Sequence, residues 1–282
     1  MKPARFSYAA PTSMSEALAL LAESEDARVI AGGQSLAPMM NMRLAQPELL
    51  VDINRIDGLS GVGLDAGSLV IGAMTRHADL AGNALVKAHA PVLAYAAGTI
   101  GHYAIRQRGT IGGSLAHADP AAQLPLVCML LDARIDATSS EGVRTIEAAD
   151  LFETLFTTTL EPSEMITSIC VPLLEPGHGW GFRLFNRRAG DFAEVSAAAI
   201  VFNREGEAAV RLALGAIASA PFRADDLLPE FDPQDAGWPT RAAAIVAEAA
   251  PIEDNARMPA DYRREVLQAL LEDVLRDAMR RA

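Results

Sequence analysis

Two short motifs of the sequence have the composition of anion-binding turns. VIAGGQSL (29–36) and TIGGSL (110–115) each place a glycine pair after an apolar residue and beside a serine. Glycine permits a positive φ and a close approach of the backbone to a ligand. Successive amides in such a turn form a concave set of donors for phosphate oxygens. We expect the two turns, each following a buried strand, to close around a dinucleotide's diphosphate, although either pair alone also fits an ordinary tight turn.

Other common sites are excluded by the motifs that the sequence lacks. Neither glycine pair fits GxGxxG or GxxxxGK[ST], which argues against a conventional nicotinamide or nucleoside triphosphate site. The five histidines form no HxH or HExxH pair, so no metal site is expected. Cys128 and Cys170 are too few and too separate to ligate an iron–sulfur cluster, and we expect both to be small buried hydrophobes. His117 is expected to be a turn residue, not a catalytic one.

The composition narrows the possible partners. The 282 residues include 24 basic and 36 acidic side chains, a formal charge of −12, which disfavours nucleic acid as a ligand. No run of about 18 apolar residues is present, so no membrane span is expected. The first residues lack the apolar centre of a signal peptide, and a cytoplasmic location is therefore expected.

The elements that must position the two motifs can be read from periodicity. Ser13, with Glu16 three residues later, predicts the start of a helix, and ARVIAGG (27–33) predicts a short buried strand that the first glycine pair stops. Strands are expected within 47–56 and 68–75. Residues 77–100 have a helical pattern that we expect to break at Pro91 and again near Gly98. Residues 119–140 suggest a short helix followed by a strand.

The second part of the chain begins after the densest cluster of turn residues, EPGHGWG at 175–181. We place a domain boundary there, giving domains 1–176 and 177–282. Residues 193–203 and 208–218 predict antiparallel strands. A long helix is expected from about residue 260, with one apolar face against its own sheet.

The two glycine motifs and their surroundings resemble a known family. AGGQSLAPMMNMRLAQPELLVDINRI and IRQRGTIGGSLAHADPAAQLP, with IGAMTRHADL and NRRAGDFAEVSAAA, are similar to the medium, FAD-binding subunit of molybdenum hydroxylases. That family includes aerobic carbon monoxide dehydrogenase and the flavin domain of xanthine dehydrogenase. The resemblance covers essentially the whole chain. It implies an α+β fold: a two-part FAD-binding domain of the PCMH, vanillyl-alcohol-oxidase-like type, then a smaller α+β domain with an antiparallel sheet and helices.

The resemblance also implies which residues bind FAD. The segment from Ala31 to Leu36 would wrap the diphosphate from one side and that from Thr110 to Leu115 from the other, with Val29 and Ile30 leading into the first loop. The residues implied as FAD contacts are Val29, Ile30, Ala31, Gly32, Gly33, Gln34, Ser35, Leu36, Thr110, Ile111, Gly112, Gly113, Ser114, Leu115, Asp119, Gln123, Ile166 and Leu184.

Two positions depart from the family pattern. Gln123 stands where the family commonly has an acidic residue near the flavin's sugar, and an amide lacks the charge-assisted strength of a carboxylate. Asp119 lies close by and either replaces that acid or caps a helix starting at Pro120. Leu184 stands where many relatives carry a lysine near the flavin ring. A cation there would stabilise reduced flavin, so the redox tuning is expected to differ.

The resemblance implies an electron-transfer subunit. A large molybdopterin subunit would oxidise the substrate, a small subunit with two 2Fe–2S clusters would pass electrons to FAD in this chain, and an external acceptor would reoxidise the flavin. A dimer of such heterotrimers is implied. The alternatives are a self-sufficient FAD oxidoreductase of the same fold and a non-catalytic assembly subunit.

Overall fold

The protein was analysed as a computed structural model that describes residues 2–174, 177–204, 207–255 and 258–282. The predicted boundary between residues 176 and 177 falls beside positions 175–176, which are outside the described residues, so the division at that point stays a prediction. Within the described ranges, no helix has both the length and the apolar character that crossing a bilayer requires.

A small parallel sheet carries the first glycine motif. Its strand order is β1 (Ser7–Ala9), β3 (Leu49–Asp52), β2 (Ala27–Ile30), and α1 (Met14–Glu23) connects β1 to β2. Ser13 caps α1 as predicted, because its hydroxyl accepts a hydrogen bond from the Glu16 amide at 3.3 Å. The strand predicted within 27–33 is present as β2, but it is less buried than expected, since Ala27 is its only buried residue. The strand ends at the first glycine pair and is followed by the short helix α2 (Leu36–Asn41).

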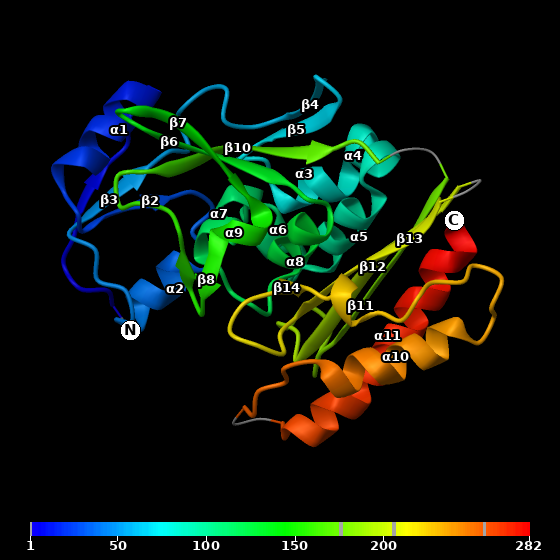
Figure 1. Ribbon diagram of the computed structural model, residues 1–282. Helices are drawn as coiled ribbons and strands as arrows, with labels where there is room; N and C mark the ends of the chain where they lie inside the picture. The colour runs from blue at the N-terminus through cyan, green and yellow to red at the C-terminus, as the bar shows by residue number, and fades with distance from the viewer. Residues whose placement is uncertain (1, 175–176, 205–206, 256–257) are drawn as a thin grey trace.

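A five-stranded antiparallel sheet and a group of helices form the centre of the molecule (Figure 1). The strand order is β4 (Val62–Asp65), β5 (Ser68–Gly72), β10 (Met165–Pro172), β6 (Arg134–Ser139), β7 (Gly142–Glu147). The hairpin of β8 (Phe152–Thr154) and β9 (Thr157–Thr158) lies apart from this sheet. The helices are α3 (His77–Gly82), α4 (Ala84–His89), α5 (Pro91–Thr99), α6 (Tyr103–Arg106), α7 (Ile111–His117), α8 (Gln123–Leu130) and α9 (Ala148–Leu151).

The last part of the chain is an antiparallel sheet with two helices on one face (Figure 1). The sheet order is β11 (His178–Phe185), β12 (Val195–Arg204), β13 (Glu207–Gly215), β14 (Phe222–Arg223), followed along the chain by the 3-10 helix η1 (Asp225–Leu227), α10 (Trp238–Ala249) and α11 (Ala260–Arg281). The predicted antiparallel pair and the predicted helix from residue 260 are therefore confirmed.

The strand β12 is buried on both faces, which joins the C-terminal sheet to the rest of the molecule. Successive side chains of a strand point to opposite faces. Ala197 and Ala199 pack with α10 and α11, whereas Ala198 and Ile200 belong to the same hydrophobic cluster as α5, α8 and the five-stranded sheet. The α+β class with helices and antiparallel sheets is as the resemblance implies.

The local expectations were met only in part. The helical region 77–100 breaks at Pro91 and ends at Thr99, next to Gly98, but it has a further break at Asn83, whose side chain caps α4. The second glycine pair does not end a strand. Gly112 and Gly113 lie in the first turn of α7, because Thr110 supplies an N-cap that starts a helix there.

Candidate cofactor-binding site

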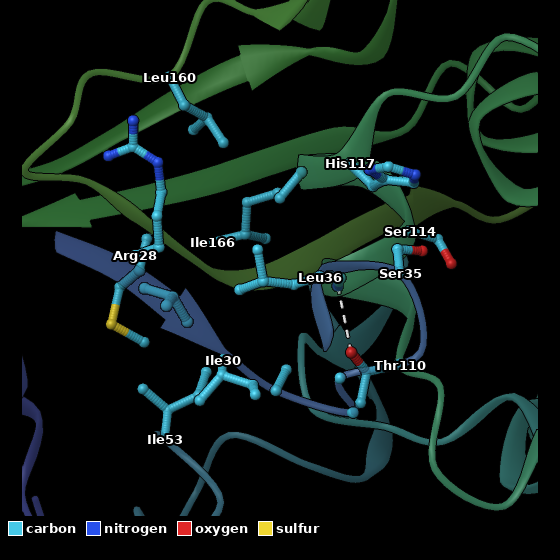
Figure 2. Close-up of a pocket in the computed structure, with 18 of the residues that line it drawn as sticks. Arg28, Ile30, Ser35, Leu36, Ile53, Thr110, Ser114, His117, Leu160 and Ile166 are labelled. Atoms are coloured by element: carbon cyan, nitrogen blue, oxygen red, sulfur yellow. Dashed lines mark hydrogen bonds between the residues drawn. The ribbon is translucent and has the colours of Figure 1, made fainter. Parts of the chain in front are cut away.

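One cavity of about 770 Å³ brings the two glycine motifs together, although 73 residues of chain lie between them. It lies between the end of β2, the start of α7 and the segment from the β8–β9 hairpin to β10 (Figure 2). Of the sequence-predicted contacts, those that line it are Val29, Ile30, Ala31, Gly32, Gly33, Gln34, Ser35, Leu36, Thr110, Gly112, Gly113, Ser114 and Ile166.

The two glycines of each pair have different roles. A Cβ on Gly32 would lie 2.0 Å from the Arg108 carbonyl oxygen, and one on Gly112 would lie 2.9 Å from the Ala73 carbonyl oxygen. These two glycines are therefore required by the close packing of backbone against backbone. Gly33 has φ +69° and no backbone neighbour at its Cβ position, so it is a glycine for the reason that we expected.

The two loops also differ in the donors that they offer. In the first loop, the amides of Gln34, Ser35 and Leu36 face no acceptor among the described residues. In the second loop, the amides of Ile111 and Gly112 donate to carbonyls of residues 75 and 73, at 3.1 and 2.9 Å. The expected symmetric cradle of amides is thus only half present, because helix capping and packing already use the second set.

The second loop contributes mainly side chains to the cavity, among them Thr110 and Ser114. The Thr110 hydroxyl accepts a hydrogen bond from the Gly113 amide at 3.1 Å, which is the dashed line in Figure 2. The same figure shows Ser114 and His117 at the side of the cavity where Ser35 lies, with Arg28 and Ile53 at the opposite side. Hydroxyls and free amides thus gather at one side of the cavity.

His77 supports the second loop from beneath. Its Nε2 lies 3.0 Å from the Thr110 carbonyl oxygen and 3.0 Å from the Ser114 hydroxyl. A carbonyl only accepts, so Nε2 carries the hydrogen and donates it, which leaves Nδ1 as an unprotonated, buried atom without a partner among the described residues. Burial, above all, lowers the pKa of His77 to about 4, and the ring is neutral at ordinary pH.

The His77–Ser114 contact resembles a nucleophile and its base but does not have that chemistry. A general base must accept the serine proton on the ring nitrogen that faces it. Here that nitrogen already holds a hydrogen directed at the Thr110 carbonyl, and the low pKa makes the ring a poor base. This pair therefore fixes geometry and does not activate Ser114.

Aromatic rings stack at the rim of the cavity. His117 and Phe156 have ring centroids 5.0 Å apart and planes 24° from parallel. Phe156 sits at the tip of the β8–β9 hairpin with φ +57°, and its amide donates to the Ala118 carbonyl at 3.2 Å. Burial lowers the pKa of His117. The hairpin tip is thereby attached to the end of α7.

The opposite side of the cavity is mainly apolar. Ile30, Ile53, Leu160 and Ile166 form this wall (Figure 2). Among the described residues that line the cavity, Arg28 is the only lysine or arginine, and its guanidinium donates to the carbonyls of residues 25 and 27. An anion in this cavity would be held by backbone and hydroxyl donors more than by basic side chains.

The remaining sequence-predicted contacts do not line the cavity. Ile111 and Leu115 are fully buried on the core side of α7. Asp119 does not cap a helix at Pro120, because α8 begins only at Gln123; its carboxylate instead accepts from the Ala121 amide at 2.9 Å, and burial raises its pKa. Gln123 is buried at the start of α8. Their contact with FAD stays a prediction.

Leu184 also lies away from the cavity lining. It is half-buried on β11 and packs against the central hydrophobic cluster, while the neighbouring Arg183 points to the opposite face and pairs with Asp277 of α11. A role of Leu184 beside the flavin stays a prediction.

Sequence reasoning missed several residues of the site, including His77, Arg28, Ile53 and Phe156. A lone histidine after IGAMTR gives no sign of its partner, since that partner lies in the second loop. Gly109 was an available signal: a Cβ there would lie 2.7 Å from the His77 ring, so a glycine before TIGG indicates a bulky neighbour. Arg28, Ile53 and Phe156 belong to no motif that would have indicated a role in the site.

The residues present suit an FAD molecule. The cavity volume is within the range of ligand sites, about 300–1,000 Å³, and the cavity has a polar and an apolar side. Free amides and hydroxyls near Gly33 are suitable donors for a diphosphate. The apolar wall suits a flat ring, and Gly33 leaves space that a side chain would fill.

Family comparison agrees with this assignment along nearly the whole chain. Residues 4–174 match the family described as FAD binding domain in molybdopterin dehydrogenase. Residues 180–278 match the CO dehydrogenase flavoprotein C-terminal domain.

Individual relatives are similar over their full length. The alpha subunit of the 6-hydroxypseudooxynicotine dehydrogenase complex of Paenarthrobacter nicotinovorans is 40% identical, covering 100% of this chain and 97% of that protein. The carbon monoxide dehydrogenase medium chain of Hydrogenophaga pseudoflava is 38% identical, with 100% and 99% covered. A solved carbon monoxide dehydrogenase from Hydrogenophaga pseudoflava, lacking the Mo-pyranopterin moiety of its cofactor, superposes with a TM-score of 0.94 at 36% identity over 100% of both chains.

Proposed function

Since the chain belongs to the family of FAD-binding medium subunits of molybdenum hydroxylases, we propose that it transfers electrons within such an enzyme. It receives them from 2Fe–2S clusters of a small partner subunit and passes them through FAD to an external acceptor. The observation that carries this proposal is the single cavity in which both glycine motifs meet.

The partners follow from what this chain lacks and from the names of its relatives. Similar proteins are named as a complex subunit, a medium chain and a medium subunit. Among the described residues, no group of three or more histidine, cysteine or carboxylate side chains gathers to hold a metal. We therefore assign the molybdopterin to a large subunit and the iron–sulfur clusters to a small one, in a dimer of heterotrimers.

The chain's own residues bind and orient the cofactor. The amides of Gln34, Ser35 and Leu36, with the Ser114 hydroxyl, hold the diphosphate, and Ile30, Ile53 and Ile166 exclude water from the apolar side. When bound, FAD accepts electrons singly or in pairs, which lets it connect one-electron and two-electron partners.

A self-sufficient FAD oxidoreductase is the first alternative, and it needs an acid–base group beside the flavin. His77 is excluded from that role by its tautomer and low pKa. A non-catalytic assembly subunit is the second alternative, and only Gln123 and Leu184 favour it.

The test compares two glycines that share a backbone conformation. Gly33 (φ +69°) lines the cavity, whereas Gly58 (φ +82°) is exposed and has no atom within 4 Å of its Cβ position. Valine at either position suffers the same left-handed strain. We expect Gly33→Val to weaken FAD binding about 100-fold or more, because its branches occupy the ligand's place, and Gly58→Val to bind FAD like the wild type.

The measurement is a fluorescence titration of the purified chain with FAD, followed by isolation of the native chain with its partners. Retention of FAD by both variants would contradict the loop assignment. Turnover of a small molecule by the chain alone would favour the first alternative. Rejection of added FAD by the wild type would favour the assembly role.

A further inference from the structure

A chain of side-chain hydrogen bonds connects the two glycine loops on the side away from the cavity. The Asn54 amide nitrogen donates to the Ala31 carbonyl at 2.8 Å, directly before the first glycine pair. Arg76 donates to the Asn54 carbonyl oxygen at 2.7 Å and, through its other terminal nitrogen, to the Arg108 carbonyl at 2.5 Å. Neither Asn54 nor Arg76 lines the cavity.

The orientation of the Asn54 side chain is fully determined by its partners. Its two N–H groups go to the Ala31 carbonyl and to Asp52, at 2.8 and 2.6 Å, and its oxygen accepts from Arg76. Reversing the amide would place N–H against guanidinium and oxygen against carbonyl, so only one orientation satisfies the hydrogen bonds.

This bond fixes the direction of a cavity-side amide. In a trans peptide the N–H points opposite to the C=O. Holding the Ala31 carbonyl toward Asn54 therefore directs the Gly32 N–H to the other side, and that amide has no acceptor among the described residues. Because glycine is conformationally permissive, the Ala31–Gly32 peptide could rotate easily. The hydrogen bond from Asn54 to the Ala31 carbonyl opposes that rotation.

The segment before α3 connects the same bond to the second loop. Arg76 pairs through its backbone with Thr110, and the His77 amide donates to the Gly109 carbonyl at 3.0 Å. The Arg76 side chain donates to Asn54. The Asn54–Arg76 pair therefore contacts the backbone beside both loops, at Ala31 and at Arg108.

We propose that Asn54 and Arg76 are positioning residues for the cofactor's diphosphate: Asn54 locks the Ala31–Gly32 peptide with its N–H toward the ligand, and Arg76 sets the distance between the two loops. This inference rests on the proposed FAD site and deepens it. Asn54 is exposed and Arg76 half-buried, and surface hydrogen bonds of this kind contribute little to global stability. Removing these hydrogen bonds is therefore expected to lower the affinity for the ligand and to leave the free energy of unfolding almost unchanged.

The experiment pairs Asn54→Leu with Asn83→Leu. Asn83 caps α4 by accepting from the Leu85 and Val86 amides and does not line the cavity, so its loss is purely structural. The full chain is titrated with ADP and with FAD by calorimetry, the melting temperature of the ligand-free protein is measured, and the Gly32 amide is followed by ¹⁵N NMR. Asn54→Asp is the second variant, because it keeps an acceptor for Arg76 and loses the donors to the Ala31 carbonyl and to Asp52.

We expect both Asn54 variants to bind ADP and FAD about tenfold more weakly, to lose the Gly32 amide shift on ADP addition, and to melt like the wild type. Asn83→Leu should melt earlier and bind normally. The inference would be overturned if the Asn54 variants bound within about twofold of the wild type and their Gly32 amide resonance still moved on ADP addition as it does in the wild type. That result would leave the FAD site intact. Failure of the wild type to bind either ligand would overturn both.

Discussion

Glycine pairs in this protein combine two physical requirements in adjacent residues. Gly32 and Gly112 are small because protein backbone packs against them, and Gly33 and Gly113 are exposed to the cavity or its rim. In a Gly-Gly motif, one glycine can therefore be required by a neighbouring protein segment, while the next glycine lies at a cavity surface. In each pair the first glycine is thus required by packing within the protein, and all four glycines line the cavity.

The pH dependence of stability is a prediction at the scale of one residue. The pKa of His77 falls from 6.5 to about 4 on folding, so the unfolded chain takes up this proton first as the pH drops. The neutral ring's contribution is present above pH 6.5 and is lost progressively toward pH 4. Between about pH 7.5 and pH 5 the wild type should lose about 2 kcal/mol more than His77→Gln.

Urea unfolding at a series of pH values measures this difference. Groups common to the two proteins cancel in the comparison. His102→Gln, at an exposed position, serves as the control for removing a histidine. Parallel pH profiles for the wild type and His77→Gln would contradict the predicted tautomer and burial.

At the scale of elements, α11 packs against β11 with backbone close to backbone. A Cβ on Gly179 would lie 1.9 Å from the Ala278 carbonyl oxygen, and one on Gly181 would lie 2.1 Å from that of Val274. Glycine on every second residue clears one face of the strand, which allows the helix backbone to contact it directly. Arg183 and Asp277 form an ion pair beside this contact.

Gly181→Ala should therefore separate the helix from the strand. We expect a loss of about 3 kcal/mol in the free energy of unfolding, since backbone atoms must move to admit the methyl group. Chemical denaturation gives this value. Gly63→Ala on β4, where nothing lies within 4 Å, is the matched control. The FAD affinity of the folded variant should be unchanged, and an equally stable Gly181→Ala would show that α11 is not packed this closely.

At the scale of the whole molecule, the net charge is negative, whereas a positive charge would attract the anionic ligand that we propose. The formal charge is −12, and among the described residues that line the cavity Asp26, Glu161 and Glu164 are acidic whereas Arg28 alone is a lysine or arginine. FAD is itself an anion, so long-range forces oppose its approach, and in the proposed site local amides would hold it.

Salt should consequently accelerate FAD association. Raising the ionic strength from about 20 to about 200 mM shortens the screening length and weakens the repulsion, so we expect the association rate constant to rise about threefold. Stopped-flow fluorescence measures this rate, with uncharged riboflavin as the control ligand. A rate that falls with salt would indicate attraction by local cations and contradict the role of the amides.

The sequence by itself determined the elements that depend on neighbouring residues and the motifs that define the family. The Ser13 cap, the break at Pro91, the strand before Gly32 and the helix from residue 260 arise from contacts a few positions apart, and periodicity reveals them. Only the tertiary structure decided how the loops meet. Asn54 reaches Ala31 and Arg76 reaches Arg108 across 23 and 32 residues. Such contacts leave no local pattern, because a side chain's partner depends on where the folded chain returns.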